Sequence, residues 1–593
     1  MRRFVQRHPR AIEAAAALVI LALPFSGLMS DYGVALLTDI GIASLVALGL
    51  VILTGVGGMT SFGQAAFVGF GAYTSAVLTV HLGWSPWLTL PVAVAVTMVC
   101  ALLIGAVTVR LSGHYLPLGT IAWGISFYYL FANIEGLGGH DGLSGIPPLR
   151  IAGHALTGTR DYFVVVFVAL ALAVVATRNL LRGRMGRAVR ALRDDALAGS
   201  AFGIQPATVK LGVFVYAAML AGVAGWLYAH FQRSVSPGPF GITAGTEYLL
   251  MAVLGGAGRI PGALLGATLV IVLRDQLQSW LPLVIGSAGN YETIVFGAVL
   301  VLLLRNASDG LWSRIVGPPQ PPDFGAAGGV VTAGHRARPE RDMPLIEVRA
   351  LRKAFGGLVA VNDVSFVVPA GRIVGLIGPN GAGKSTTFNL ITGVLAPTAG
   401  EVLFRGTALA APTPQQMARL GVGRSFQHAA VAPEMSVIEN VMLGAHLRGR
   451  AGMVAAVLGL DRKEEVVLFE TASRALERIG LADVAAVPAG ALSLGQLRLV
   501  EIARALALDP LVLLLDEPAA GLRVGEKKAL ARLLRELRQE GISVLLVEHD
   551  MDFVMSLADH LVVLDFGTRI AEGDAGAISG NPRVIEAYLG GVE

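Results

Sequence analysis

The most constraining feature of this sequence is a series of long apolar runs within its first 315 residues. A helix needs about 20 mostly apolar residues to cross the hydrocarbon core of a bilayer. A water-soluble fold that carried such runs would expose large apolar patches. The first half of the chain is therefore predicted to be an all-α membrane domain of about ten spans: 11–29, 34–54, 62–81, 87–109, 114–133, 161–178, 210–231, 247–257, 261–274 and 291–305.

The composition divides the chain in two. Of the 593 residues, 54% are hydrophobic and only 15% are charged, whereas soluble proteins carry roughly 25% charged residues. The first 315 residues hold 31 of the 88 charges, so we expect a membrane domain, 1–315, followed by a soluble one. The single cysteine, Cys100, excludes an internal disulfide. The net charge of +4 does not indicate nucleic-acid binding, and no nucleic acid partner is expected.

Arginine placement predicts the orientation of the spans, because basic residues favour the cytoplasmic side. The segment 178–193 is arginine-rich, and so is the N-terminus, with Arg2, Arg3, Arg7 and Arg10. Six spans between these two regions place both in the cytoplasm and loop 134–160 outside. Ten spans also leave the C-terminal half in the cytoplasm. Eight spans with a re-entrant segment at 247–257 are the alternative.

Glycines interrupt the apolar runs at 54–64, 68–73 and 253–266. They fit close packing of membrane helices, and they also fit broken helices around a substrate path. Both interpretations stay open at this point. Asp39 is the one ionisable candidate within a span, so a proton-coupled carrier is not expected.

A Pro/Gly-rich segment, 316–344, separates the two halves and is predicted to be a flexible tether. From Leu345 onward, short apolar strands alternate with charged helical stretches, which is typical of a parallel α/β sheet. The soluble domain is therefore expected to cover 345–593.

Within this domain an apolar strand, 373–377, runs into GPNGAGKST at 378–386. This matches the phosphate-binding pattern G-x-x-x-x-G-K-S/T, in which backbone N–H groups surround phosphate oxygens at the start of a helix. Lys384 is expected on the β- and γ-phosphates and Ser385 on Mg²⁺. The predicted nucleotide contacts are Gly378, Pro379, Asn380, Gly381, Ala382, Gly383, Lys384, Ser385 and Thr386.

Two further apolar strands end in polar residues. Strand 511–515 precedes Asp516 and Glu517, which suit a magnesium ligand and a group that orients the attacking water. Strand 542–547 precedes Glu548-His549-Asp550. A lone histidine in such a place is more often structural than catalytic.

These residues together resemble the ATPase domain of ATP-binding-cassette (ABC) transporters. LSLGQ at 492–496 is similar to the signature L-S-G-G-Q, with Leu494 in place of the first glycine. The resemblance implies nucleotide contacts from Ser493, Gly495 and Gln496. It also implies catalytic or metal-sensing roles for Gln427, Glu517 and His549, with Gln427 and Asp516 near Mg²⁺. Phe355 is implied to stack on adenine, and a core phenylalanine is the alternative.

The likeness extends to one family. The stretches 352–366, 425–446 and 581–590 resemble the first ATPase subunit of the branched-chain amino-acid importer. Four other stretches resemble the second permease subunit of that importer: 113–124, 142–147, 186–211 and 253–267. Because these subunits are usually separate chains, this chain looks like a natural fusion.

The resemblance implies ATP- and Mg²⁺-dependent import of hydrophobic amino acids across the bacterial inner membrane. The implied partners are a separate permease, a separate ATPase and a periplasmic binding protein. Urea, short amides or aromatic acids are alternative substrates. A fused exporter and a membrane-anchored regulatory ATPase are less favoured, because the spans are short and numerous and the loops resemble those of an importer.

Two local features remain open. Arg523 and Val524 replace the Asn-Pro that is usual in this subunit, which puts communication between the two ATP sites in doubt. The arginine-rich stretch 182–204 fits a cytoplasmic anchor and also a coupling helix seated in a groove of an ATPase domain. Both roles can hold together.

Overall fold

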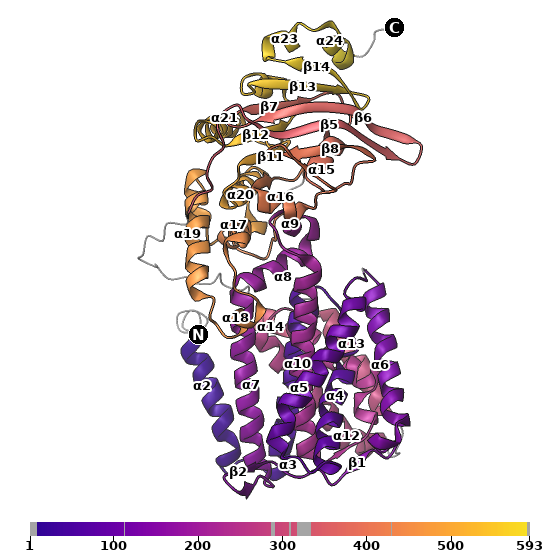
Figure 1. Ribbon diagram of the computed structural model, residues 1–593. Coiled ribbons are helices and arrows are strands. Elements are labelled where there is room, and N and C mark those ends of the chain that lie inside the picture. The colour runs from indigo at the N-terminus through magenta and orange to yellow at the C-terminus, as the bar shows by residue number, and fades with distance from the viewer. Residues whose placement is uncertain are drawn as a thin grey trace. The chain divides into compact units, whose positions relative to one another are not determined.

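The computed structural model describes residues 9–111, 113–285, 291–306, 310–316, 334–427 and 430–589 (Figure 1). The chain forms two compact units, and they do not follow chain order. Residues 1–180 and 207–320 form one, called here the helical unit, and residues 181–206 and 321–593 form the other, the α/β unit. A segment between two apolar helices thus belongs to the C-terminal fold. The predicted arginines Arg2, Arg3 and Arg7 and most of the predicted tether lie outside the described residues.

Every predicted apolar segment coincides with a helix. These are α2 (Pro9–Ala22), α3 (Asp31–Leu50) with the π-helical η2 (Val51–Val56), α4 (Gln64–Val80), α5 (Pro86–Thr108), α6 (Tyr115–Asn133), α7 (Thr159–Arg182), α10 (Pro206–Gln232), α11 (Ile242–Gly256), α12 (Ile260–Ile285) and α13 (Tyr291–Asn306). Among the described residues, five helices are long and apolar enough to cross a membrane, and α4 and α11 are shorter apolar helices.

The remaining elements of the helical unit are small. The two-residue strands β1 (Leu143–Ser144) and β4 (Ser234–Val235) pair with each other, as do β2 (Arg150–Ile151) and β3 (His154–Ala155). A short helix, α14 (Leu311–Val316), follows α13. The described residues of this unit thus form helices and connecting loops apart from these two strand pairs, as predicted.

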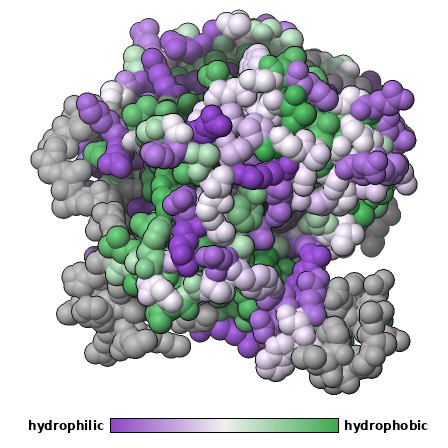
Figure 2. All heavy atoms as spheres, turned by 90° about the horizontal axis from the view of Figure 1, so that it is seen from below, coloured by the Kyte–Doolittle hydropathy of each residue, from purple (hydrophilic) through white to green (hydrophobic). Residues whose placement is uncertain are grey.

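Helix flanks and loops of the helical unit differ in polarity. On α5, Leu102, Leu103 and Val107 are largely exposed, and on α7 so are Val168 and Leu172. Apolar residues recur there at helical spacing, which suits contact with hydrocarbon rather than water. Figure 2 views the molecule from the lower end of Figure 1, where loops join the helices. On this face hydrophilic residues lie among the hydrophobic ones.

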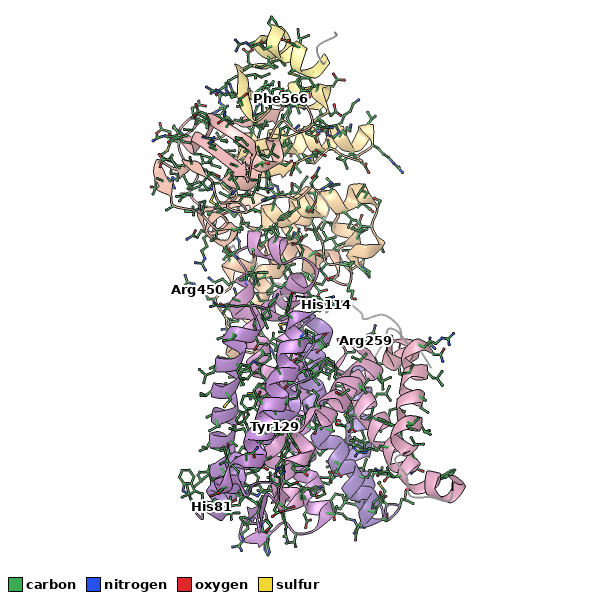
Figure 3. All side chains as sticks on the ribbon, turned by 90° about the vertical axis from the view of Figure 1, so that its right-hand side faces the viewer. His81, His114, Tyr129, Arg259, Arg450 and Phe566 are labelled. Atoms are coloured by element: carbon green, nitrogen blue, oxygen red, sulfur yellow. The ribbon has the colours of Figure 1, made fainter. Side chains whose placement is uncertain are left out.

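Successive helices of this unit run in opposite directions. In Figure 3, His114, just before α6, and Arg259, between α11 and α12, lie at one end of the unit. His81, just after α4, lies at the opposite end. The segments 247–257 and 261–274 lie on two helices, α11 and α12, joined by a turn, and that both cross the membrane stays a prediction.

Some glycines of this unit serve close packing. A Cβ on Gly255 would lie 1.7 Å from the carbonyl oxygen of Gly262, so α11 and α12 touch backbone to backbone. A Cβ on Gly71 would lie 2.1 Å from Gly222 O, which places α4 against α10 in the same way. At these positions the packing interpretation is confirmed.

A different glycine segment breaks a helix. The chain leaves helical geometry after η2, passes through 57–63 and re-enters it at α4. A Cβ on Gly55 would lie 2.2 Å from Gly258 N, so this break packs against the turn between α11 and α12. Two interruptions of apolar helices therefore lie side by side.

The α/β unit is built on a six-stranded sheet. Five strands are parallel and the last is antiparallel, in the order β10 (Val422–Arg424), β11 (Val512–Asp516), β12 (Ser543–Val547), β7 (Ile373–Ile377), β13 (His560–Asp565) and β14 (Thr568–Gly573). The three strands predicted from apolar runs are β7, β11 and β12, correct to within one residue and adjacent in the sheet. Residues that follow them therefore meet at one sheet edge.

The start of this unit differs from the prediction. Instead of alternating with helices, β5 (Pro344–Phe355) and β6 (Leu358–Pro369) form an antiparallel hairpin, joined by β8 (Ala399–Phe404) and β9 (Thr407–Leu409). Apolar residues alternate with polar ones here, so one face of the hairpin is buried. It packs on the parallel sheet around Ile346, Val364 and Phe388.

Helices surround the parallel sheet. A core around β11 and β12 also includes residues of α17 (Val437–Gly444), α19 (Arg462–Arg478), α20 (Leu494–Ala507) and α21 (Val524–Gln539). The inserted segment contributes α8 (Arg184–Asp194) and α9 (Ala196–Ala201). The shorter helices are α15 (Lys384–Ile391), α16 (Pro414–Leu420), α18 (Met453–Val457), α22 (Met551–Met555), α23 (Ala575–Ser579) and α24 (Pro582–Leu589).

Candidate nucleotide site and inserted helices

The phosphate loop connects the buried strand β7 to α15. Gly378 and Gly383 have φ angles of 151° and 91°. A Cβ on Gly378 would lie 2.1 Å from Leu564 O, and one on Gly383 would lie 2.5 Å from Ala360 O. Only glycine fits at either position. The first N–H groups of α15 have no side-chain cap, which leaves them available to an anion.

Lys384 supplies the positive charge of this loop. Its Nζ donates to the carbonyl oxygens of Gly378 at 2.7 Å and Pro379 at 2.8 Å. Burial lowers the pKa of the Lys384 ammonium, and the carboxylates of Glu517 and Asp516 oppose that shift. The ammonium thus lies within the loop that the sequence predicts to hold phosphates.

Asp516 ends β11 with its side chain buried. Burial raises the pKa of its carboxyl to about 6, and the Arg424 guanidinium opposes the shift. Its Oδ1 is buried without a hydrogen-bond partner in the part of the chain that the structure describes. An oxygen of this kind needs a ligand, and carboxylate and hydroxyl oxygens suit Mg²⁺. The residues present, Asp516 and Ser385 with its hydroxyl in the first turn of α15, therefore fit a magnesium ion.

Glu517 and His549 follow neighbouring strands and lie close together. Glu517 has a φ of 48° and donates its N–H to Val547 O at 2.8 Å, which fixes it to the end of β12. The Nδ1 of His549 lies 3.8 Å from Glu517 Oε2. The two predicted catalytic side chains are thus brought to the same sheet edge as Asp516.

Glu548 was not assigned a role from the sequence. Its side chain is buried and accepts hydrogen bonds from the N–H groups of Ala519 at 2.7 Å and His549 at 3.2 Å. It therefore fixes the segment after Glu517 to the segment of His549. An acid directly after an apolar strand was the available signal, although it did not distinguish Glu548 from its neighbours.

Gln427 follows β10, the strand beside β11. Its side chain is exposed, while its backbone carbonyl accepts a hydrogen bond from Arg498. Arg498 also donates to Phe426 O at 2.5 Å and pairs with Glu501 at 3.2 Å. The Gln427 segment is therefore anchored to α20, the helix that begins at the signature, and Arg498 is a residue that the sequence reasoning missed.

The signature residues form the start of α20. Ser493 caps the helix: its hydroxyl accepts from Gln496 N at 3.4 Å, and its own N–H donates to Gln496 Oε1 at 3.0 Å. Leu494 is 55% exposed, and Gly495 is buried. Among the described residues, no hydrogen bond or ion pair joins these residues to the phosphate loop.

Phe355 ends β5 and is 46% exposed, so it is not a core phenylalanine. The ammonium of Lys353 lies 5.2 Å from the ring centroid. The ring is therefore accessible, and its stacking on adenine stays a prediction.

The inserted helix α8 is held by two ion pairs, to α19 and to α17. The Arg187 guanidinium is 1% exposed and lies 2.7 Å from Glu465 Oε2 on α19. Arg190 pairs with Glu439 on α17 at 2.9 Å. The backbone N–H of Arg184 adds a hydrogen bond to Glu465 Oε1 at 2.6 Å.

Two further contacts extend the surface of the ATPase fold on which the inserted segment 181–206 lies, called here the seat. The Arg184 guanidinium donates to the carbonyls of His446 at 2.8 Å, Gly449 at 2.6 Å and Ala451 at 2.7 Å. At the end of α9, Arg504 lies over the buried Phe202 ring at 4.7 Å. The same arginine donates to Ala430 O at 2.7 Å. The inserted segment is thus connected through α20 to the region of Gln427.

Comparison with family models now identifies the class of protein. Residues 361–520 match the ABC transporter model, and residues 33–304 match the permease component of the branched-chain amino acid transport system. Residues 568–593 match the branched-chain amino acid ATP-binding cassette transporter. The molecule is therefore an ABC transporter subunit that joins a permease to an ATPase. Specifically, the chain belongs to the branched-chain amino acid ABC transporter family.

Three relatives match the C-terminal half. The high-affinity branched-chain amino acid transport ATP-binding protein LivG of Escherichia coli K12 is 44% identical over 250 residues, which cover 42% of this chain and 98% of LivG. BraF of Pseudomonas aeruginosa, with the same description, is 42% identical over 42% of this chain and 98% of its own. A probable LivG of Archaeoglobus fulgidus is 38% identical over 42% and 96%.

These matches confirm the predicted family, fold class and ATPase activity. The helical unit is a permease domain of a membrane protein, and the α/β unit is an ABC ATPase that binds ATP and hydrolyses it to drive transport.

Proposed function

We propose that this chain is the fused permease–ATPase subunit of a system that imports branched-chain or related hydrophobic amino acids. The seating of the permease segment 181–206 on the ATPase fold is the observation that carries the proposal. Such a seat gives ATP hydrolysis a direct mechanical connection to the permease chain. The relatives, whose names describe branched-chain amino acid transport, support the substrate class. Urea, short amides and aromatic acids are the alternative substrates.

At the nucleotide site, the backbone from Gly378 to Gly383 with Lys384 and Thr386 would hold the phosphates. Ser385, Asp516 and the side chain of Gln427 would hold Mg²⁺, which when bound neutralises charge that develops on the phosphates. Glu517 would orient or deprotonate the attacking water, and His549, 3.8 Å from Glu517, would stabilise that arrangement. Phe355 would stack on adenine.

Coupling would run through the region of Gln427. A shift of Gln427 toward the nucleotide would act on Arg498 of α20, because a hydrogen bond joins them, and Arg504 of the same helix donates to Ala430 O. From there Arg504 and Phe202 would pass the movement to α9 and α8. In this proposal the stretch 182–204 is a coupling element as well as a positive-inside anchor.

The proposed assembly is heteromeric. Ser493, Gly495 and Gln496 would act on nucleotide bound by a separate ATPase subunit, and a separate permease subunit would complete the path. A periplasmic binding protein would deliver the substrate. The complex would lie in the bacterial inner membrane with ten spans, and the ATPase would face the cytoplasm. Arginine placement supports this orientation.

Transport by the assembled complex tests the proposal. We expect ATP-dependent leucine uptake into vesicles only when the chain is reconstituted with its partner subunits and binding protein. Isoleucine and valine should compete, and the competition pattern of urea, short amides and phenylalanine decides between the alternatives. Lys384→Ala should weaken nucleotide binding and abolish uptake. Full uptake by this chain with the binding protein alone would exclude the heteromeric assembly.

Cysteine labelling tests the topology. After Cys100→Ser, an impermeant reagent added outside should modify Gly142→Cys, in loop 134–160, and spare Ala196→Cys, in α9. The reverse pattern would refute the ten-span orientation.

A further inference from the structure

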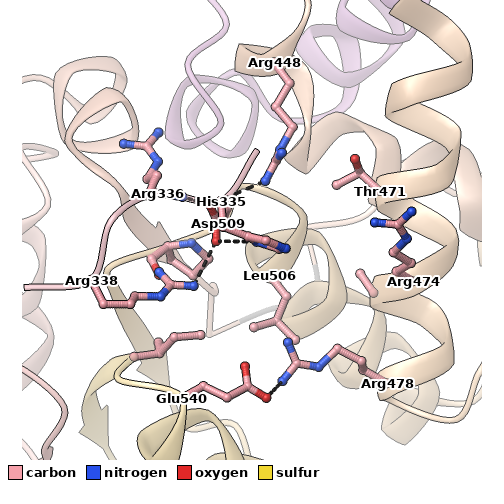
Figure 4. Close-up of a pocket in the computed structure, with 13 residues that line it drawn as sticks. His335, Arg336, Arg338, Arg448, Thr471, Arg474, Arg478, Leu506, Asp509 and Glu540 are labelled. Atoms are coloured by element: carbon pink, nitrogen blue, oxygen red, sulfur yellow. Dashed lines mark hydrogen bonds and ion pairs between the residues drawn. The ribbon is translucent and has the colours of Figure 1, made fainter. Parts of the chain in front are cut away.

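A cavity of about 350 Å³ lies in the α/β unit among residues that the nucleotide site does not use (Figure 4). Five arginines and one histidine line it, but only two acids, Asp509 and Glu540. The cavity therefore carries a surplus of positive charge.

One wall is organised around the buried Asp509. Its carboxylate accepts from the Arg338 guanidinium at 2.9 Å and from the backbone N–H of Arg336 at 2.6 Å. Arg448 approaches at 3.7 Å and His335 at 3.5 Å. Burial lowers the pKa values of the Arg336 and Arg448 guanidinium groups, and a neighbouring arginine adds to the shift in each case. One carboxylate thus faces several cationic groups.

The opposite wall is α19. Arg474 and Arg478 extend from this helix on the side of the cavity opposite the Asp509 cluster, and Arg478 reaches Glu540 (Figure 4). Arg478 pairs with Glu540 at 2.6 Å, and among the described residues Arg474 has a longer contact, 3.6 Å, with Glu470. Their side chains are 41% and 38% exposed, for Arg474 and Arg478 respectively. Both can therefore reach a ligand that enters from solvent.

Three residues of the first wall belong to the segment that joins the two halves of the chain. His335, Arg336 and Arg338 lie after the end of the permease match, residue 304, and before the start of the ATPase match, residue 361. The predicted tether is thus bound to the ATPase fold from Gly334 onward rather than free. Without this segment the wall around Asp509 would keep only Arg448 of its basic lining residues.

We propose that this cavity binds the phosphate group of a small anionic ligand. Planar guanidinium groups match phosphate oxygens in a forked geometry, and charge-assisted hydrogen bonds of this kind are strong. The volume lies within the range of small-molecule sites. A bound phosphate would join the tether to α19, the helix that also carries Glu465, the partner of Arg187. The ligand would therefore connect the fused tether to the seat of the inserted helices.

Calorimetric titration of the full chain tests this site. The chain is placed in phosphatidylcholine nanodiscs with saturating ADP, which occupies the phosphate loop, and inorganic pyrophosphate is added. We expect one binding event that Arg474→Gln/Arg478→Gln weakens at least tenfold, since each lost charge-assisted bond is worth roughly one power of ten. Arg532→Gln, an exposed arginine of α21 outside the cavity, should bind as the parent does. Arg474→Gln alone, which leaves the pair of Arg478 with Glu540 intact, should also weaken binding.

Two outcomes would overturn the proposal: no binding of pyrophosphate by the parent, or equal affinity in the parent and in both cavity variants. A second arm with phosphatidic acid in the nanodiscs identifies the source of the phosphate. Weaker pyrophosphate binding there, in the parent but not in the double variant, would show that a lipid headgroup fills the same site. Unchanged binding would point to a soluble phosphate ligand.

Discussion

Two glycine-rich turns of this molecule precede a helix, and they differ in how their polar groups are satisfied. The phosphate loop, 378–383, leads into α15, and the break at 57–63 leads into α4. In the first, Lys384 is held by two carbonyls of its own loop. In the second, Gln64 is fully buried, and both its amide nitrogen and its oxygen are without a hydrogen-bond partner among the described residues.

The difference shows which functional sites a sequence reveals. Phosphate binding requires a fixed backbone path and a charge, so few residue patterns can provide it. A break in an apolar helix requires only glycine, and packing requires the same residue, as at Gly255 and Gly262. We infer that substrate or water forms hydrogen bonds with the buried Gln64 amide during transport.

The largest expected effect lies at the nucleotide site. Glu517→Gln removes the group proposed to orient or deprotonate water, and hydrolysis should fall by about 10²–10⁴-fold while ATP still binds. Phosphate release and nucleotide binding by the assembled complex measure the two effects. Glu536→Gln, on an exposed face of α21, is the matched control. Near-parent turnover would remove Glu517 from its role.

The second prediction separates hydrolysis from transport. Arg187→Ala leaves the Glu465 carboxylate without its guanidinium partner, and breaking a buried pair costs about 3–5 kcal/mol. Uptake should be lost while the nucleotide site keeps its capacity to hydrolyse ATP. Arg193→Ala is the variant for comparison. It removes an ion pair with Glu434, at 3.6 Å, that is more exposed, so the loss should cost at most about 1 kcal/mol of stability. Coupled uptake by Arg187→Ala would contradict the proposed seat.

The third prediction concerns pH at the same seat. Burial, with the charges of Arg184 and Arg187, lowers the pKa of His446 to about 3. An unfolded histidine titrates near 6.5, so stability should be present above that pH and lost as the pH falls toward 3. The slope is about 1.4 kcal/mol per pH unit, or about 2 kcal/mol by pH 5.

Thermal unfolding of the parent and of His446→Asn at neutral and mildly acidic pH measures this loss. The variant should lose less stability between the two conditions than the parent. Equal losses would show that another group titrates there.

The last prediction concerns the helical unit. Gln64→Met replaces an unpaired buried amide with an apolar side chain of similar length, and stability should rise by about 1–3 kcal/mol. Uptake should nevertheless fall, because the amide that would bond to substrate or water is lost, whereas ATP hydrolysis should continue. Gln232→Met, at the exposed end of α10, should change neither quantity. Normal uptake by Gln64→Met would reduce the break at 57–63 to a packing feature.

The sequence predicted features that depend on local patterns. The positions of the apolar helices, β7 and the phosphate loop follow from runs of residue types along the chain. Pairings between distant segments could not be predicted in this way. Glu247 of α11 pairs with Arg274 of α12 at 2.9 Å, and Tyr32 of α3 with Asp275 of α12, so polar groups in this unit are not confined to Asp39.

The same limit applies to the soluble half. The hairpin 344–369 was not predicted. Alternating apolar and polar residues indicate a strand, but they do not reveal whether the next element of the chain is a second strand or a helix. Glu548 and Arg498 were missed because their importance comes from backbone groups that only the fold brings near them.

The position of α8 and α9 within one polypeptide has a consequence for binding strength. Because the permease segment and the ATPase fold are parts of the same chain, their association is intramolecular and does not depend on the concentration of a second subunit. A seat too weak to hold two freely diffusing subunits together would still be occupied here. We therefore expect fusion to relax the affinity required of Arg187 and Arg190, so that this interface can be optimised for release and rebinding rather than for permanent attachment.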